Sequence, residues 1–320
     1  MNDIYIGIDV GSVSTNVVSL DEDKRVLESL YLRTMGRPVW AVQEGLRQIL
    51  DEMGEVRVRG VGTTGSGRHL AAVMVGADAV KNEITAHAVG AAHFFPEVRT
   101  IFEIGGQDSK LIVLQNGVVV DFAMNTVCAA GTGSFLDQQA LRLRIPIEEF
   151  GERAVAAQQG ARIAGRCGVF AESDMIHKQQ MGYPTEEIIA GLCEALARNY
   201  LNNLGKGKHI ESPVVFQGGV AANKGMRKAF ERILDMEIAV PPHHDVMGAV
   251  GAALLASESG KPNESAFKGI DFVLNGHFEN RSHICGDCPN QCEIVSIERQ
   301  GQTLSYWGDR CSKWQSMITH

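Results

Sequence analysis

Two separated cysteines have the side chain and the setting needed to bind an iron–sulfur centre. Cys128 lies in the segment 125–133 and Cys167 in the segment 165–173, and a predicted helix follows each of them. A four-iron cluster takes four thiolates, so two cysteines supply half of its ligands. A symmetric pair of chains could therefore share one cluster. Considered alone, each cysteine could equally be a small buried apolar residue.

Three glycine turns, the first two of which follow an acidic residue, have the composition of a nucleotide site. A turn without side chains lets backbone N–H groups approach phosphate oxygens, and a nearby carboxylate can hold Mg²⁺ through its waters. We assign catalytic roles to Asp9 and Glu103 as the acids, and to Gln107 and Asp108 as groups that orient an attacking water. The predicted nucleotide-binding residues are Gly11, Ser12, Val13, Ser14, Thr15, Gly105, Gly106, Gly218 and Gly219.

A third feature is the group of four cysteines near the end of the chain. Cys285, Cys288, Cys292 and Cys311 follow the spacing C-x2-C-x3-C-x18-C. Closely spaced thiolates with a distant fourth suit either structural zinc or an iron–sulfur cluster, and the redox setting slightly favours a cluster. The alternative is four unliganded thiols in a flexible end. The remaining cysteine, Cys193, has helical spacing and apolar neighbours, which indicate a core position.

The elements that position these residues follow a pattern that occurs twice. Each half starts with a strand pair joined by a glycine turn beside an acid, and this repetition predicts a duplicated α/β unit. In the first half we expect strands at 4–10, 13–20, 26–33 and 56–61 and helices at 39–53 and 80–94. In the second half we expect strands at 98–104, 110–114, 118–124, 213–217 and 236–240 and helices at 132–143, 169–180, 185–203, 221–234 and 245–257. The composition changes after 259–263, where we expect a boundary.

Composition excludes several classes of function. The chain has 320 residues, 44% of them hydrophobic, and a net charge of −8, which argues against a nucleic-acid partner. No apolar run approaches the roughly 18 residues of a membrane span, and no secretory signal opens the chain. We therefore expect a cytoplasmic protein without a membrane partner, whose cysteines are free thiols or metal ligands and not disulfides. No G-x-x-x-x-G-K-[ST] loop is present, which excludes a P-loop enzyme.

These motifs resemble the actin, sugar-kinase and heat-shock-chaperone ATPase superfamily. The segment 7–12 resembles its first phosphate motif, 103–109 its second, and 217–220 its adenosine motif. Within the superfamily, the chain is most similar to the activators of 2-hydroxyacyl-CoA dehydratases, the BadF/BadG/BcrA/BcrD ATPase family. The segments that carry this resemblance are 103–110, 125–135, 167–173 and 217–223.

The resemblance implies a duplicated ribonuclease-H-like, actin-like α/β fold with two lobes and a small Cys-rich C-terminal extension. The first lobe would comprise 1–90, completed by a helix at 243–258, and the second 91–242, with the cluster cysteines and the adenosine motif. The Cys-rich tail would comprise 261–320, which resembles the connector of longer relatives. In two places the chain differs from the family: Glu103 replaces a common Asp, and Asn16 a common Lys.

The resemblance also implies a function. We expect a homodimer with one [4Fe-4S] cluster ligated by Cys128 and Cys167 of each subunit. ATP with Mg²⁺ would bind between the lobes, and its hydrolysis would drive a low-potential electron into an iron–sulfur dehydratase or reductase. Reduced ferredoxin or flavodoxin would be the donor.

Two other classes of function remain open from the sequence. A small-molecule kinase, for example for an amino sugar, shares the fold but needs no cluster cysteines. A non-catalytic assembly or sensing protein would use nucleotide as a structural ligand and the tail metal as its sensor.

Overall fold

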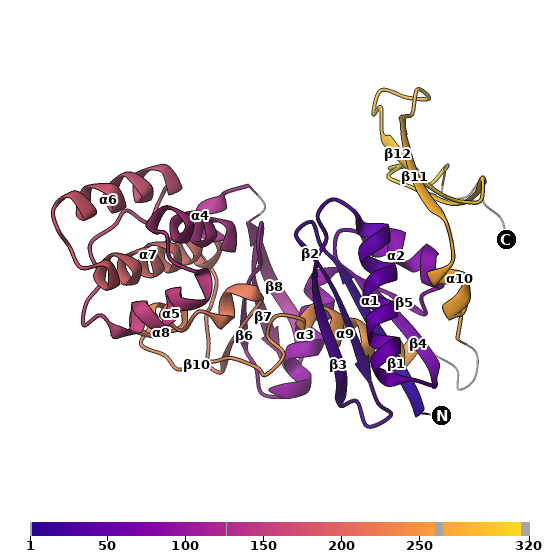
Figure 1. Cartoon of the computed structure of the whole chain (residues 1–320), viewed down its shortest axis with the longest axis horizontal. Helices are drawn as coiled ribbons and strands as arrows, with labels where there is room; N and C mark the ends of the chain where they lie inside the picture. The colour runs from indigo at the N-terminus through magenta and orange to yellow at the C-terminus, as the bar shows by residue number, and fades with distance from the viewer. Residues whose placement is uncertain (1, 126, 260–264, 315–320) are drawn as a thin grey trace. The chain divides into compact units, whose positions relative to one another are not determined.

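The computed structural model describes residues 2–125, 127–259 and 265–314, and the chain divides into two compact units. One unit comprises the chain up to Ala86 together with the chain from Gly248 onward, and the other comprises His87–Met247 (Figure 1). Thr126 of the first cysteine segment, the predicted break at 260–263 and the segment 315–320 lie outside the described residues. The domain limits that we predicted from the sequence stay a prediction.

The first unit is built on a five-stranded mixed sheet with the order β3-β2-β1-β4-β5. Its strands are β1 (Asn2–Val10), β2 (Ser14–Leu20), β3 (Val26–Arg33), β4 (Val56–Thr64) and β5 (Ala79–Val80). Strands β1, β2 and β3 form an antiparallel meander, whereas β4 and β5 add in parallel. Helices α1 (Pro38–Met53) and α2 (Arg68–Val75) pack on this sheet, and α9 (Met247–Ser259) returns to the unit late in the chain.

The second unit repeats this plan. Its sheet has the order β10-β9-β6-β7-β8, from β6 (Thr100–Ile104), β7 (Ser109–Gln115), β8 (Val118–Asn125), β9 (Val214–Gln217) and β10 (Ile238–Ala239). Again three antiparallel strands are followed by two parallel ones. The helices are α3 (Glu83–Phe94), which starts in the first unit, α4 (Gly133–Leu143), α5 (Ile147–Ala156), α6 (Gly168–Gln180), α7 (Thr185–Tyr200) and α8 (Lys224–Leu234).

Four aromatic rings fill the core of the second unit. Phe102, Tyr200, Phe216 and Phe230 contact one another with ring centroids 5.0–5.4 Å apart. They come from β6, α7, β9 and α8, so this cluster joins the sheet to the helices on it. Edge-to-face aromatic packing adds to the stabilisation from burial alone.

The duplicated α/β fold predicted from the sequence is confirmed, because both sheets have one topology. The predictions missed α2 and α5, which are eight and ten residues long and too short to show a clear helical period. Helix α8 begins at Lys224 and not at 221, because residues 219–222 form a 3₁₀ turn and the Asn223 side chain caps the helix at Met226 N. Helix α7 ends at Tyr200 and continues as a π turn, Leu201–Gly205.

The Cys-rich end of the chain forms a small sheet of its own, which the sequence analysis did not predict. After α10 (Ile270–Leu274), strands β11 (Phe278–Ile284), β12 (Glu293–Arg299) and β13 (Gln302–Trp307) pair antiparallel in the order β11-β12-β13. Val273, Phe278 and Ile297 are buried in the core of the first unit. The tail is thus anchored by apolar contacts and also by Gln43, whose Nε2 donates to the carbonyl of Val273 at 2.9 Å.

Candidate functional site

The first glycine turn, between β1 and β2, is tied to the end of β3. Gly11 N donates to Ser14 O at 2.8 Å, which closes the turn, and Thr34 N donates to Val13 O at 2.8 Å. The hydroxyl of Thr34 donates to Gly11 O at 3.1 Å and lies 3.0 Å from the hydroxyl of Thr15. The turn brings together the predicted residues Gly11, Ser12, Val13, Ser14 and Thr15, with Ser12 exposed at its tip.

The acid of this half, Asp9, lies beside a second glycine turn that the sequence analysis missed. Strand β4 runs parallel to β1 and pairs Thr64 with Asp9. Gly65 follows with a φ of +88°, and a Cβ on it would lie 2.5 Å from Asp9 Oδ1, closer than real contacts allow. Gly67 N then donates to Val10 O at 2.8 Å. The available signal was the small-residue run 63–67 directly after an apolar strand.

The acid of the second half is held in a buried ion pair. Glu103 is 4% exposed, and its Oε2 accepts from Lys110 Nζ at 2.9 Å. Lys110 also donates to Asp108 Oδ2 at 2.8 Å, while Gly105 N donates to Asp108 O at 3.1 Å. The lysine therefore sets the positions of two predicted catalytic carboxylates. Gln107, the fourth predicted catalytic residue, is exposed on the same turn.

Lys110 contacts two predicted catalytic residues, and we did not select it from the sequence. Its side chain is 2% exposed, and a buried lysine needs a charged partner to remain protonated. The antiparallel register of β6 and β7 pairs it with Glu103, and this register could have been inferred from the short turn between the two strands. The positive charge of Lys110 offsets the negative charge of Glu103, so Glu103 attracts Mg²⁺ less strongly than a carboxylate without a cationic partner.

The third glycine turn contacts the second acid as Gly65 contacts the first. Gly218 has a φ of +89°, and a Cβ on it would lie 2.8 Å from Glu103 Oε1. Gly218 N donates to His244 O at 2.7 Å, and Gly219 opens the 3₁₀ turn toward α8 with open space at its Cβ position. The structure thus brings Gly105, Gly218 and the acid into one cradle within the second unit, while Gly106 O accepts from Ser134 N at 2.9 Å.

A buried histidine supports the strand that ends at this cradle. The Nε2 of Gln217, the residue before Gly218, lies 3.0 Å from His87 Nδ1. Burial, together with the smaller effect of the Lys110 charge, lowers the pKa of His87 to about 3. His87 is therefore neutral near pH 7, so Gln217 donates and Nδ1 accepts.

The first of the two cysteines predicted to bind a cluster, Cys128, is held by an asparagine. Asn125, the last residue of β8, donates from Nδ2 to Cys128 O at 2.8 Å, and its Oδ1 accepts from Cys128 N at 3.0 Å. This two-way bond fixes the backbone of Cys128 directly before the 3₁₀ turn Ala129–Gly131. The Cys128 side chain is partly exposed, which leaves its sulfur accessible.

The second cysteine predicted to bind a cluster, Cys167, precedes α6, and a residue of α7 joins the two cysteine segments. Cys167 is partly exposed and stands at the N-cap of α6, where Ala171 N donates to its carbonyl at 2.9 Å. Asn199 donates from Nδ2 to Arg166 O at 3.2 Å, and its Oδ1 lies 3.0 Å from where a Cβ of Gly131 would be. The structure thus brings the two cysteine segments onto one end of the second unit, with α4 and α6 above α7 (Figure 1).

Exposed apolar side chains flank both cysteines. Val127 is 95% exposed, Val169 is 71% exposed and Phe170 is 65% exposed. Large exposed apolar side chains that gather around potential ligands are typical of a protein interface. The two thiols are partly exposed, lie on adjacent segments and are surrounded by these apolar side chains. This arrangement fits a cluster whose other ligands come from a second chain.

The other cysteines differ from these two. Cys193 is buried, as the sequence predicted, and burial raises the pKa of its thiol to about 12. In the tail, Cys285 is buried, Cys292 is partly exposed, and Cys288 and Cys311 are exposed. Within 2–125, 127–259 and 265–314, no three His, Cys, Asp or Glu side chains converge closely enough to hold a metal ion. The predicted tail site therefore stays a prediction.

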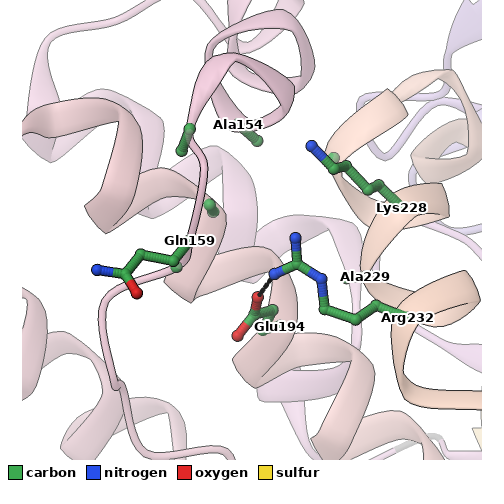
Figure 2. Close-up of a pocket in the computed structure, with 10 residues that line it drawn as sticks. Ala154, Gln159, Glu194, Lys228, Ala229 and Arg232 are labelled. Atoms are coloured by element: carbon green, nitrogen blue, oxygen red, sulfur yellow. Dashed lines mark hydrogen bonds and ion pairs between the residues drawn. The ribbon is translucent and has the colours of Figure 1, made fainter.

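A small pocket between α5, α7 and α8 contains none of the predicted site residues. Figure 2 shows Arg232 pointing to Glu194, with their charged groups 2.7 Å apart, and Gln159 and Lys228 on the opposite walls. The charged groups of Arg232 and Glu194 therefore pair with each other.

In the described part of the chain, no helix combines the length and the apolar run of a bilayer span.

Comparisons with known proteins agree with this geometry. The sequence model of the BadF/BadG/BcrA/BcrD ATPase family matches residues 6–256. The 2-hydroxyisocaproyl-CoA dehydratase activator of Clostridioides difficile is 34% identical over 83% of this chain and 99% of its own length. The (R)-2-hydroxyglutaryl-CoA dehydratase activating ATPase of Acidaminococcus fermentans is 35% identical over 78% of this chain and 96% of its own.

A solved structure has the same fold. The activator of the 2-hydroxyisocaproyl-CoA dehydratase from Clostridium difficile with bound ADPNP is 33% identical, with a TM-score of 0.73. The alignment covers 80% of this chain and 94% of that one. The family match ends at residue 256, so β11, β12 and β13 lie beyond it.

Proposed function

Because the chain belongs to the BadF/BadG/BcrA/BcrD ATPase family, we propose that it is an ATP-dependent activator of a 2-hydroxyacyl-CoA dehydratase or a related iron–sulfur reductase. Relatives that match over nearly their full length are named as dehydratase activators, and a solved relative contains the ATP analogue ADPNP. The protein would use ATP hydrolysis to pass a low-potential electron to that partner. Reduced ferredoxin or flavodoxin would supply the electron in the cytoplasm.

The observation that carries this proposal is the pairing of the Cys128 and Cys167 segments. Asn125 and Asn199 hold these segments by side-chain contacts, so their partly exposed thiols stay at one end of the unit. A homodimer would add the same two thiols and complete the four ligands of one [4Fe-4S] cluster. When bound, the cluster would supply a one-electron redox centre.

The protein's own residues would prepare that site. Cys167 precedes the thirteen residues of α6, and the positive end of a helix favours the thiolate over the thiol. The exposed Val127, Val169 and Phe170 would be covered by the second subunit, which removes water from around the ligands. Small residues at 129–131 let the backbone come close to the cluster.

The nucleotide would be bound by the glycine turns. The backbone N–H groups of the turns after Asp9 and Glu103 would donate to phosphate oxygens, and Gly218-Gly219 would accept the adenosine. The space at the Cβ position of Gly219 is open and leaves room for a ligand, whereas a Cβ on Gly65 or Gly218 would clash with oxygens of the protein itself. Asp9 would orient waters of Mg²⁺ and Asp108 would orient the attacking water, while Lys110 pairs with both Glu103 and Asp108.

Anaerobic purification with iron and sulfide analysis tests the cluster. The wild type should hold about four irons per dimer, and Cys128→Ser and Cys167→Ser should each lose them while still binding ADPNP. Cys193→Ala, which changes a buried thiol that is not a ligand, is the matched control and should keep the iron. Activation of a dehydratase partner should disappear with the iron.

Two results would refute the proposal. One is a colourless, monomeric wild type after purification without oxygen. The other is phosphoryl transfer to a small-molecule acceptor that persists in the Cys128→Ser/Cys167→Ser double variant, since a kinase of this fold has no need of either thiol.

A further inference from the structure

The four cysteines of the tail lie at one end of its small sheet. Cys285 follows the last residue of β11, and Cys292 precedes the first residue of β12, so both stand at the mouth of the β11–β12 loop. Cys285 N donates to Cys292 O at 2.8 Å, which continues the strand pairing by one step. Cys288 lies inside this loop, and Gln291 N donates to its carbonyl at 3.2 Å.

The topology brings the distant fourth cysteine to the same end. Strand β13 is antiparallel to β12, and its last residue, Trp307, pairs with Val295 near the start of β12. Gly308 follows with a φ of +104° and packs so closely on the carbonyl of Glu293 that no side chain fits there. The chain that carries Cys311 therefore leaves the sheet beside the β11–β12 loop.

Two side-chain contacts hold the Cys311 segment against this loop. Trp314 Nε1 donates to Cys285 Sγ at 3.4 Å, and Lys313 forms an ion pair with Asp287. The Trp314 ring also packs on His283, with centroids 4.7 Å apart. An indole N–H that donates to a sulfur is an interaction that suits a thiolate better than a thiol.

We propose that Cys285, Cys288, Cys292 and Cys311 bind one Zn²⁺ ion in a closed tetrathiolate site, which is separate from the proposed cluster and lies outside the family match. Directly opposed, hydrogen-bonded residues of an antiparallel pair have α-carbons about 5.5 Å apart, so the sulfurs of Cys285 and Cys292 can approach closely. Four thiolates about 2.3 Å from one zinc ion lie roughly 3.8 Å apart. A four-iron cluster places each thiolate on a different iron and spreads them further.

The small size of the sheet gives the metal a structural role. Strand β11 is exposed at every residue after Phe278, and within β12 only Ile294, Ser296 and Ile297 are buried. A sheet with so little core needs an additional link, and a zinc ion bound at its open end provides one. Zinc would draw the exposed thiols of Cys288 and Cys311 inward onto the ion.

Metal analysis of the full-length chain tests this site. The wild type should contain about one zinc per chain. Cys288→Ser and Cys311→Ser each replace one ligand at an exposed position, outside the cores of the two units, and each should lower the zinc content about tenfold or more. Cys128→Ser is the matched control, which should lose the proposed cluster iron but keep the zinc. Added Co²⁺ should give the visible absorption of a tetrahedral cobalt thiolate in the wild type and not in Cys311→Ser.

Three outcomes would overturn the proposal. They are a wild type without zinc whose four tail thiols all react freely, zinc that persists in both tail variants, and iron with sulfide that is lost on Cys288→Ser. The last of these would identify a second iron–sulfur cluster. Because the zinc is measured with and without Cys128, failure here is distinguishable from failure of the proposed function.

Discussion

The two halves of the molecule pack a glycine against an acid in the same way, but they place a different residue across the strand pair from that acid. Asp9 and Glu103 each lie one residue before the end of the first strand of a sheet, and Gly65 and Gly218 pack against them at positive φ after the parallel strand. Across the antiparallel pair, however, Asp9 faces Asn16, whereas Glu103 faces Lys110. The comparison shows that the glycine cradle belongs to the fold, while the charge beside it differs between the halves.

This difference suggests that the two acids have different roles. Asp9 has a neutral residue across its strand pair, whereas Lys110 offsets the charge of Glu103 and positions Asp108. In the second half, the residue paired with the acid on the parallel strand is Gln217, which contacts the buried His87. In the first half, the equivalent residue is Thr64. Three predictions probe this comparison, in order of decreasing effect.

The largest effect is expected from Lys110→Met. This change removes the cation that neutralises the buried Glu103 and should lower the free energy of unfolding by about 3–5 kcal/mol. Denaturant unfolding at pH 7 measures the loss. Lys224→Met, at an exposed lysine paired with Glu152, is the control and should change stability by less than about 1 kcal/mol. The double variant Lys110→Met/Glu103→Gln should recover most of the loss, and no recovery would contradict the role assigned to this ion pair.

The shared cradle predicts matched losses from Gly65→Ala and Gly218→Ala. Each change puts a Cβ into a positive-φ residue against a carboxylate oxygen and should lower the free energy of unfolding by roughly 2–4 kcal/mol. Calorimetry of the two variants beside Gly117→Ala checks this. Gly117 also has a positive φ but open space around it, so that variant should lose only about 1 kcal/mol. Equal losses in all three variants would mean that backbone strain alone, and not the close approach to the acid, explains the glycines.

The smallest effect is a pH dependence through the buried His87 of the second half. The pKa of His87 is about 3 in the folded protein against an ordinary value of 6.5, so the unfolded chain binds a proton more readily between these values. Its contribution to stability is complete above pH 6.5 and is lost as the pH falls below it, by at most about 1.4 kcal/mol per pH unit. Between pH 7 and pH 5.5 the free energy of unfolding should fall by roughly 1 kcal/mol through this residue.

The variant His87→Asn isolates that contribution. Its amide oxygen can still accept from Gln217 but does not titrate in this range. Urea unfolding of wild type and variant at the two pH values should therefore show a weaker pH dependence in the variant. If both proteins lose stability equally between pH 7 and pH 5.5, His87 is not the group responsible.

Much of the fold was predictable because its signals are local. Alternating apolar residues and glycine turns marked the strands, and their repetition predicted the duplication that both sheets confirm. Helices α2 and α5 were missed because each has only two or three turns, over which a helical period cannot be separated from chance. The tail sheet was missed because its strands are mostly exposed and carry little apolar alternation.

For the site, the sequence by itself determined which groups are available: acids beside glycine turns, and two cysteines ahead of helices. Only the tertiary structure decided which distant residues meet them. Gly65 reaches Asp9 through the parallel pairing of β4 with β1, and Asn199 joins the cysteine segments from α7. These contacts link residues far apart in sequence or on opposite strands, and their geometry follows from strand register and helix packing, which no local pattern of residues encodes.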